Sequence, residues 1–409
     1  MTRSRDVAIT GIGMLTPGGR TADATWQAVC QGRSLARTDP ELAGLPVDIS
    51  CRVDEFDPDA VYGRRLARRL DRFAHLVLTT ARQAVTDAKL DPASWESGRV
   101  GVILGVGSNS LETYEREFTS LGRGRPTAVS PLALPRSLPN MVAGEVALFL
   151  GARGPNFTVS SACASGAAAI GVGREMLLSG ACDVVLVGGT ESGRSRMSAT
   201  CFAQMQALSR RTDDPAAASR PFDTERDGLV LSEGAAVLVM ERPEHAQQRG
   251  AQVRALLRGY GSSADAHHPV APHPQGEGAE QAMRAALSDA GCGIGDVDHV
   301  NAHGTSTPVG DTAEALALLR LFRGAPPAVT ATKSVLGHAM SASAAIEAAL
   351  TVLALEHQAI PPTANLRQQA PGRELDIVTD RPRPAALGVA LSNSFGFGGQ
   401  NSVLVLATP

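Results

Sequence analysis

The chain has 409 residues, 43% of them hydrophobic and 19% charged, with 38 Lys and Arg against 41 Asp and Glu. This length suits two domains or two fused halves around a large core, and the composition excludes disordered and fibrous proteins. A net charge of −3 gives no overall field for nucleic acid or an anionic membrane. Aromatic residues are only 4%, so we expect Val, Leu, Ile and Ala to form a buried parallel sheet under small-residue helices.

Short apolar runs bounded by glycine recur and predict buried strands, in residues 7–15, 100–107, 182–189, 235–241 and 401–407. Alanine-rich segments with helical spacing lie between them, at 164–178 and 341–355. The alternation predicts an α/β protein built in layers. A polar, arginine-rich stretch over 241–261 is the best candidate for a seam, so we expect two halves, residues 1–250 and 251–409.

Six cysteines are scattered without a CxxC pair, at Cys30, Cys51, Cys163, Cys182, Cys201 and Cys292. The pattern indicates a reduced, cytoplasmic protein without a structural metal site. Because neither a long apolar stretch nor a signal-peptide pattern occurs, we expect neither secretion nor membrane spanning.

Cys163 lies where a β-prone run, residues 157–160, meets a helix-prone run. A cysteine at a helix N-terminus is favoured as thiolate by the helix dipole and the free amides. Ala162, Ala164 and Gly166 would leave room for a substrate. A buried structural cysteine is the commoner alternative.

Two histidines stand in similar turns. His303 follows a short apolar run within DHVNAHGTSTPVGD, and His338 follows Lys333 within TKSVLGH. Histidine is the side chain best suited to move protons near neutral pH, as a nucleophilic thiolate requires. Each alone could be a structural core residue; together with Cys163 they indicate a catalytic site.

A glycine-rich turn, SNSFGFGGQN, includes Gly396, Gly398 and Gly399. Glycine allows backbone conformations and close approaches that other residues do not, and the amides there could form one side of an oxyanion hole. The dinucleotide, phosphate-loop and hydrolase-elbow motifs are absent.

These blocks, with SRPFDTERDG and SEGAAVLVME, resemble the condensing enzymes of fatty-acid and polyketide synthesis, of the beta-ketoacyl-acyl carrier protein synthase II type, from Val7 to Leu406. The resemblance implies a thiolase-like fold of two similar halves in five α-β-α-β-α layers, the first half carrying the nucleophile and the second the histidines. It implies a ketosynthase, which condenses an acyl thioester with a malonyl-acyl carrier protein by decarboxylative Claisen chemistry, in fatty-acid or type II polyketide or polyene synthesis.

The resemblance also implies residue roles. Cys163 would take the acyl chain, and His303 and His338 would assist decarboxylation. The Cys163 and Phe397 amides would form the oxyanion hole, and the Phe397 ring would gate the cysteine. Lys333 would act behind the histidines, with Glu347 and Asp311 in the surrounding shell. Substrate contacts would come from Ser108, Phe202, Thr305, Thr307, Phe395, Gly398 and Gly399.

The expected partners are an acyl carrier protein and a second ketosynthase-like chain, identical or a chain-length factor, and neither nucleic acid nor membrane. An arginine cluster would dock the carrier, comprising Arg64, Arg65, Arg68 and Arg69. Arg210 and Arg211 would contribute. The carrier's phosphopantetheine arm would bring the substrate, without a permanently bound cofactor or metal.

The chain departs from the family at three places. Ser108, Asn109 and Ser110 replace a glycine-rich loop at the expected floor of the acyl pocket, the run AMSASAAIEA after His338 replaces a more glycine-rich pattern, and Val270 replaces a frequent threonine. Chain length and starter unit therefore stay open. Two alternatives stay open as well, a non-catalytic chain-length-factor-like subunit and a non-decarboxylating, thiolase-like acyltransferase.

Overall fold

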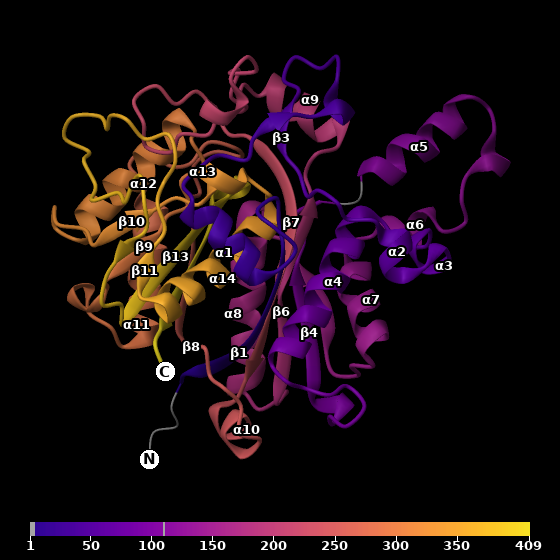
Figure 1. The fold of residues 1–409 in the computed structure, drawn as a ribbon, viewed down its shortest axis with the longest axis horizontal. Coiled ribbons are helices and arrows are strands. Elements are labelled where there is room, and N and C mark those ends of the chain that lie inside the picture. Colours follow the sequence, from indigo (N-terminus) through magenta and orange to yellow (C-terminus); the bar gives the residue numbers. More distant parts are fainter. Residues whose placement is uncertain (1–4, 109–110) are drawn as a thin grey trace.

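The computed structural model describes residues 5–108 and 111–409, and its main sheet path contains two sets of five strands (Figure 1). The first set is β1 (Val7–Leu15), β4 (Val100–Gly105), β5 (Asn156–Val159), β6 (Val184–Ser192) and β7 (Leu231–Glu241). The second set is β8 (Ala255–Ala264), β9 (His299–Asn301), β10 (Ala328–Thr330), β13 (Val389–Gly396) and β14 (Gln400–Ala407).

Both sets have the same topology. The spatial order is β5-β4-β6-β7-β1 in the first set and β10-β9-β13-β14-β8 in the second, so corresponding strands occupy corresponding places. In each set the first three strands in this order run parallel to one another. The fourth strand then pairs antiparallel with both the third and the fifth. The sets meet where β1 pairs with β8. This repetition shows two similar halves; their division into residues 1–250 and 251–409 stays a prediction.

The expectation of a parallel sheet was wrong, because each set is mixed. The tight turn Phe397–Gly399 between β13 and β14 leaves no room for a crossover, so these strands must run antiparallel. All strands of the first set except β5 are buried along their length. Burial on both faces gives the same apolar runs whatever the strand direction, which is why composition could not distinguish the two cases.

Helices complete the five predicted α-β-α-β-α layers (Figure 1). α8 (Ser165–Leu178) and α14 (Ser341–His357) pack on each other between the two strand sets. α4 (Arg72–Asp87) and α7 (Asn140–Leu150) cover the outer face of the first set. α11 (Glu277–Ala290) and α12 (Pro308–Leu321) cover the outer face of the second.

The small residues of the central layer are needed for packing. A Cβ atom at Gly166 would lie 2.7 Å from the Ala345 backbone nitrogen, and one at Gly105 would lie 2.4 Å from the Ser165 carbonyl carbon. Gly166 therefore lets α8 approach α14, instead of leaving room for a substrate as expected. The close contacts fix the start of α8, two residues after Cys163.

One part of the first half extends from the body at the right of Figure 1, with α5 (Leu111–Gly122) and α6 (Ala133–Ser137). Exposed apolar side chains concentrate in the part of the chain from α5 to the edge strand β5: Phe118, Leu121, Leu132, Leu134, Leu138, Leu148, Phe149 and Phe157. Such a concentration of exposed apolar side chains indicates an interaction surface.

The shorter elements connect and cover these layers. The helices are α1 (Ala22–Cys30), α2 (Pro58–Tyr62), α3 (Arg64–Ala67), α9 (Arg196–Gln204), α10 (Pro243–Gln248) and α13 (Lys333–Leu336). The strands are β2 (Arg37–Thr38), β3 (Ile49–Cys51), β11 (Ala359–Ile360) and β12 (Arg383–Pro384). Over residues 5–108 and 111–409, no helix combines the length and apolarity needed to cross a membrane.

Candidate active site

Cys163 lies in a turn between the edge strand β5 and the central helix α8, as the sequence predicts. The turn Ala162–Ala164 is a single 3₁₀ turn, and Ala162 adopts a φ of +50°. A left-handed conformation is costly for alanine and is held here by the surrounding packing. The result is a 7% exposed Cys163 whose Sγ lies 3.1 Å from His338 Nε2.

The charge state of Cys163 differs from the expectation. Burial raises the pKa of its thiol to about 11, although Lys333 and the backbone amides of Phe397 and Cys163 lower it. Desolvation thus outweighs the helix start. The resting form is the thiol, and the thiolate predicted from the helix start alone was wrong. Both amides expected in an oxyanion hole do act on the sulfur.

His338 is fixed by hydrogen bonds on both sides. Its backbone amide donates to Val230 at 2.8 Å, and its Nδ1 lies 3.0 Å from Ser343 Oγ. Ser343 Oγ already accepts from the Ala339 amide, at 2.9 Å. We therefore infer that the Ser343 hydroxyl donates its proton to His338 Nδ1, which acts as the acceptor. Burial lowers the pKa of His338 well below its ordinary value. The ring is therefore neutral and carries its own proton on Nε2.

His303 is also fixed by hydrogen bonds, to Glu314 and Lys333. Its backbone amide donates to Glu314 Oε1 at 2.8 Å, and Lys333 Nζ lies 2.7 Å from its carbonyl oxygen and 3.4 Å from Nδ1. Lys333 also pairs with Glu347 at 2.5 Å, where both side chains are buried. Burial and Lys333 lower the pKa of His303, so this ring is neutral too. The ammonium at Nδ1 leaves the proton on Nε2.

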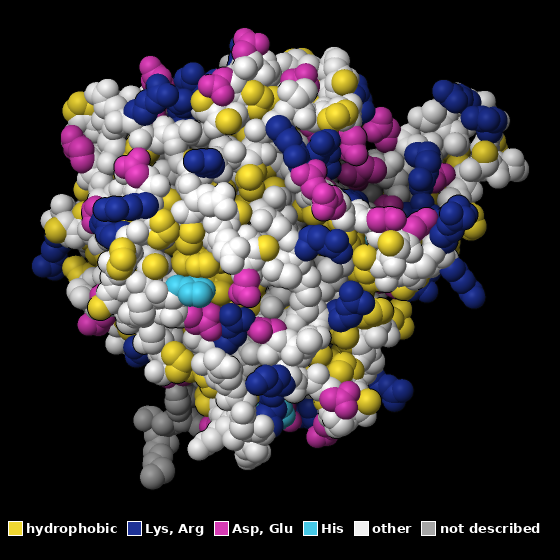
Figure 2. All heavy atoms as spheres, viewed as in Figure 1, with side chains coloured by type: hydrophobic (Ala, Val, Ile, Leu, Met, Phe, Trp, Pro, Cys, Tyr) yellow, Lys and Arg dark blue, Asp and Glu magenta, His cyan; other side chains and the backbone are white. Residues whose placement is uncertain are grey.

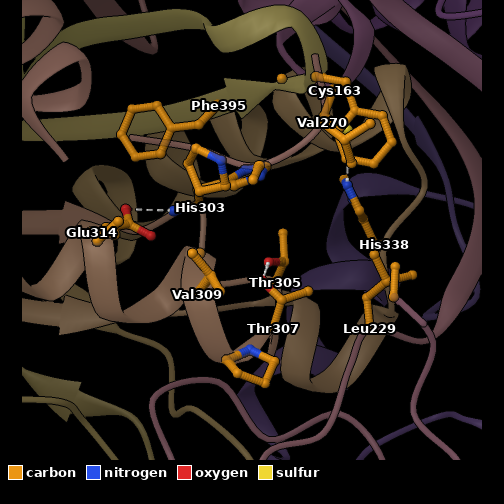
Figure 3. A pocket seen from close by; sticks show the side chains of 18 of the residues that line it. Cys163, Leu229, Val270, His303, Thr305, Thr307, Val309, Glu314, His338 and Phe395 are labelled. Carbon is orange, nitrogen blue, oxygen red and sulfur yellow. Dashed lines mark hydrogen bonds between the residues drawn. The ribbon is translucent and has the colours of Figure 1, made fainter. Parts of the chain in front are cut away.

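The three predicted side chains line one cavity of about 400 Å³ (Figure 3). The two imidazole rings are 5.6 Å apart and nearly perpendicular, at 86°. The structure also brings together Phe202, Thr305, Thr307, Phe395 and Phe397 in the cavity wall. The hydroxyls of Thr305 and Thr307 lie 3.0 Å apart, and the Phe202 and Phe397 rings pack at 5.7 Å beside Cys163. Val270 lines the cavity in place of a hydroxyl.

Gly398 and Gly399 do not line this cavity. They adopt the positive φ angles that favour glycine, +80° and +68°. The Gly398 amide donates to Pro269 and the Gly399 carbonyl accepts from Asp265, each at 2.8 Å. These contacts fasten the turn of Phe397 to the loop that carries Val270. Gly396 lies close to the backbone of Ser161, since a Cβ atom on Gly396 would lie 2.4 Å from the Ser161 carbonyl oxygen.

Ser108 also lies outside the cavity wall, and its hydroxyl donates to Glu191 at 3.3 Å. Asn109 and Ser110 lie outside the described residues. Asp311 accepts from the Ser306 amide at 3.0 Å, so it supports the threonine loop and does not contact the imidazole rings. Burial raises the pKa of Asp311 to about 7.

Sequence reasoning missed Glu314 and Ser343, which hold the two histidines. Glu314 receives the amides of His303 and Gly304, both at 2.8 Å. It follows Asp311 by three residues on α12 and so shares its helix face, a spacing that could have identified it. Ser343 carries no comparable signal, because it stands in an alanine-rich run.

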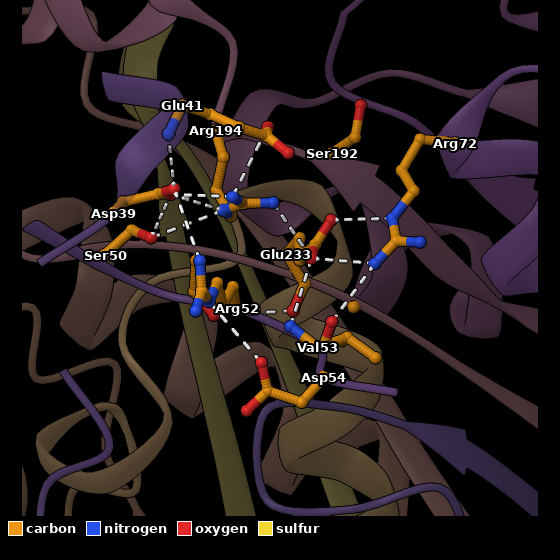
Figure 4. Close-up of polar contacts among 12 residues, drawn as sticks. Asp39, Glu41, Ser50, Arg52, Val53, Asp54, Arg72, Ser192, Arg194 and Glu233 are labelled. Carbon is orange, nitrogen blue, oxygen red and sulfur yellow. Dashed lines mark hydrogen bonds and ion pairs between the residues drawn. The ribbon is translucent and has the colours of Figure 1, made fainter. Parts of the chain in front are cut away.

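A buried ionic network fixes the segment between β6 and α9 (Figure 4). Arg194 pairs with Asp39 at 2.7 Å and with Glu233 at 3.1 Å, and Glu233 pairs with Arg72 at 3.0 Å. Removal of one member of such a network leaves an uncompensated buried charge. The network therefore holds the start of α9, the helix that carries Phe202.

The predicted docking arginines differ in side-chain exposure and in ion pairing. The Arg64 side chain is 82% exposed, and Arg68 lines a surface pocket with Arg116 and Arg136. Arg69 is paired with the buried Glu145 at 2.5 Å and is less available than expected. Figure 2 shows Lys and Arg side chains over this side of the molecule, around α2, α3 and α5. Arg210 lines a separate shallow pocket, and Arg211 lies near Glu225 and Asp227.

In the described part of the chain, no group of three or more His, Cys, Asp or Glu side chains is placed to hold a metal ion.

The sequence matches the family models for the beta-ketoacyl synthase N-terminal domain, over residues 4–246, and C-terminal domain, over residues 254–367. It is 40% identical to a 3-oxoacyl-(acyl-carrier-protein) synthase 2 of Synechocystis, over 97% of each chain. The ishigamide ketosynthase/chain length factor structure is 33% identical with a TM-score of 0.93, and covers 99% of this chain and 100% of its own. A type II polyketide synthase acyl-carrier protein in complex with its ketosynthase, bound to a hexaketide, matches at 28% identity and TM-score 0.92, covering 100% of both chains. This chain belongs to the beta-ketoacyl synthase family.

Proposed function

We propose that the protein is a 3-oxoacyl-(acyl-carrier-protein) synthase that condenses an acyl thioester with a malonyl-acyl carrier protein, with loss of carbon dioxide. One observation carries the proposal: the Cys163 sulfur and two neutral imidazoles line a single cavity. Covalent capture of the acyl chain divides a difficult bimolecular reaction into two positioned steps.

In the first step the Cys163 sulfur attacks the carbonyl carbon of the incoming thioester. The amides of Cys163 and Phe397, which act on this sulfur, are placed to stabilise the oxyanion that forms. The bond to the pantetheine sulfur then breaks. The thiol proton of Cys163 leaves with the pantetheine thiol, so an acyl-Cys163 remains.

In the second step a malonyl thioester loses its carboxylate as carbon dioxide. The released electron pair forms an enolate, whose oxygen accepts hydrogen bonds from Nε2 of His303 and His338. Its carbon attacks the acyl carbonyl on Cys163, a carbon–carbon bond forms, and the carbon–sulfur bond to Cys163 breaks. The sulfur leaves as a thiolate and regains its proton from water. The product is a 3-ketoacyl thioester, two carbons longer. Each donor to such an oxyanion typically contributes a factor of about 10² to 10³ in rate.

The substrate would arrive on the phosphopantetheine arm of an acyl carrier protein, with the arm passing Thr305 and Thr307. The exposed arginines near α3 suit an acidic carrier. The exposed apolar residues and the edge strand β5 suit a second ketosynthase-like chain, either a copy or a chain-length factor. We place the enzyme in the cytoplasm without a permanently bound cofactor.

Two features argue against the alternatives. A non-catalytic subunit does not need a cysteine 3.1 Å from a histidine that is itself fixed by a serine. A thiolase-like enzyme uses a second cysteine, whereas the residue facing Cys163 here is His338.

Intact-mass measurement after incubation with a panel of acyl-carrier thioesters tests the proposal. We expect the mass of the wild-type chain to rise by one acyl group and that of Cys163→Ala to stay unchanged, while both unfold at similar temperatures. Acylation of folded Cys163→Ala would remove Cys163 as the nucleophile.

A further inference from the structure

A buried carboxyl group that the steps above do not use lies at the end of β6. Glu191 is 4% exposed and acts electrostatically on Cys163. Its Oε2 accepts from the Gly107 amide at 3.1 Å, and its Oε1 accepts from the Ser108 hydroxyl at 3.3 Å. Oε2 also lies 2.9 Å from the Ser341 hydroxyl. The carboxyl group thus joins the loop after β4 to the first residue of α14.

The hydrogen bonds of the Ser341 hydroxyl indicate whether the Glu191 carboxyl group is protonated. Ser341 Oγ lies 2.9 Å from Glu191 Oε2 and also 2.9 Å from the Thr190 carbonyl oxygen. A hydroxyl has one proton and a carbonyl oxygen can only accept. If Glu191 were ionised, one of these two contacts would lack a proton. A protonated Oε2 that donates to Ser341 satisfies both, because Ser341 then donates to Thr190.

The charged surroundings agree with a neutral group. Glu112 of α5, a like charge, acts on Glu191, and Glu191 in turn raises the pKa of Cys163 in the turn before α8. His338 Nε2 lies 3.1 Å from the Cys163 sulfur, and Lys333 also acts on it electrostatically. Burial is the largest cause that raises the pKa of Glu191, to about 7. Ionisation near neutral pH would place a negative charge beside the sulfur.

We propose that Glu191 is a positioning residue that acts in its protonated form, tying the Gly107–Ser108 loop after β4 to α14 and keeping negative charge away from the Cys163 sulfur. The inference rests on the proposed role of Cys163. Ionised Glu191 disfavours the Cys163 thiolate. Once Glu191 has lost its proton, the reaction rate of Cys163 is therefore lower than the rate expected from the ordinary increase of thiolate with pH.

Alkylation of Cys163 by iodoacetamide, followed by intact mass from about pH 6 to about pH 9, tests this inference without any condensation. In the wild type, a plot of the logarithm of the alkylation rate against pH should show two straight segments of equal slope. Near neutral pH, where Glu191 ionises, the plot should bend from the first segment to the second, which is displaced to lower rates. Glu191→Gln should remove the bend, alkylating about fivefold faster than the wild type at about pH 8.5 and within about twofold at about pH 6. Glu117→Gln, which changes a carboxyl group paired with Arg116 on α5, should keep the wild-type profile.

Ser341→Ala provides a second variant that separates the two proton arrangements. If Glu191 donates to Ser341, loss of the hydroxyl destabilises the neutral acid and moves the bend to lower pH. A move to higher pH would mean that Ser341 donates to a carboxylate, and would overturn the inference. Superimposable profiles of folded Glu191→Gln and wild type would overturn it as well. Continued acylation of Cys163→Ala would instead count against the proposed function alone.

Discussion

At the scale of single residues, the chemistry depends on which nitrogen of each imidazole carries the proton. Ser343 contacts Nδ1 of His338 and Lys333 approaches Nδ1 of His303, so both rings direct an Nε2 proton into the cavity. Two neutral donors can hold an enolate oxygen without transferring a proton to it. The surrounding residues therefore act by fixing ring orientation and tautomer.

Ser343→Ala should affect the two half-reactions differently. Loss of the hydroxyl leaves the His338 ring without its Nδ1 partner, so we expect condensation to slow about tenfold, equivalent to one lost hydrogen bond. Acylation of Cys163 should stay within about twofold of wild type. Single-turnover measurement of each step checks this, and Ser343→Thr should restore condensation. Equal slowing of both steps would contradict a role through His338.

His299 should make folding sensitive to acid. It is 1% exposed, its Nδ1 lies 3.0 Å from the Ala328 carbonyl oxygen, and burial lowers its pKa to about 4. A depressed histidine pKa means that the unfolded chain binds more protons, so stability falls as pH drops from about 6.5 to about 4. The upper limit of this contribution is about 3 kcal/mol.

His299→Asn keeps a donor for Ala328 but does not titrate. Urea unfolding at a series of pH values should show that the wild type loses stability relative to this variant below about pH 6.5. A constant difference between the two chains across this range would contradict the buried neutral state of His299.

At the scale of elements, the sequence predicted what local pattern controls. The apolar runs became buried strands, the two alanine-rich stretches became α8 and α14, and three motif turns met in one cavity. Strand direction was missed because buried strands look alike in either direction. Ser343 and Glu191 were missed because their partners depend on tertiary packing; Glu191 receives the Gly107 amide across 84 residues.

Substitution at Gly166 tests the central helix layer that sets the position of Cys163. Gly166→Ala would force its Cβ to within 2.7 Å of the α14 backbone, and we expect a loss of about 1–3 kcal/mol in the free energy of unfolding. Gly144→Ala is a matched control on α7, because nothing lies within 4 Å of its Cβ position, and there helix propensity should add up to about 1 kcal/mol. Chemical denaturation measures both; equal effects would contradict the packing argument.

At the scale of the whole molecule, two repeated halves bring residues from distant parts of the chain to one cavity. Cys163 comes from the first half and both histidines come from the second, between corresponding strand sets. The exposed apolar surface and the arginines around α3 lie on the first half. If the proposed roles of these surfaces hold, catalysis, carrier docking and assembly use different parts of the molecule.

Charge reversal at Arg65 and Arg68 tests carrier docking. We expect the double variant Arg65→Glu/Arg68→Glu to bind an acidic acyl carrier protein less tightly, with a larger loss at low than at high ionic strength. Its rate with a small, carrier-free thioester should be unchanged. Arg284→Glu on the outer helix α11 is the control and should leave carrier binding unaffected. Salt-independent weakening would contradict electrostatic docking.

The release of labelled carbon dioxide from carboxyl-labelled malonyl-acyl carrier protein tests the shared-cavity mechanism most directly. Folded Cys163→Ala should still release carbon dioxide but form no 3-ketoacyl product, whereas His303→Ala and His338→Ala should each release it about 10²- to 10³-fold more slowly than wild type. Release at the wild-type rate by either histidine variant would contradict the account.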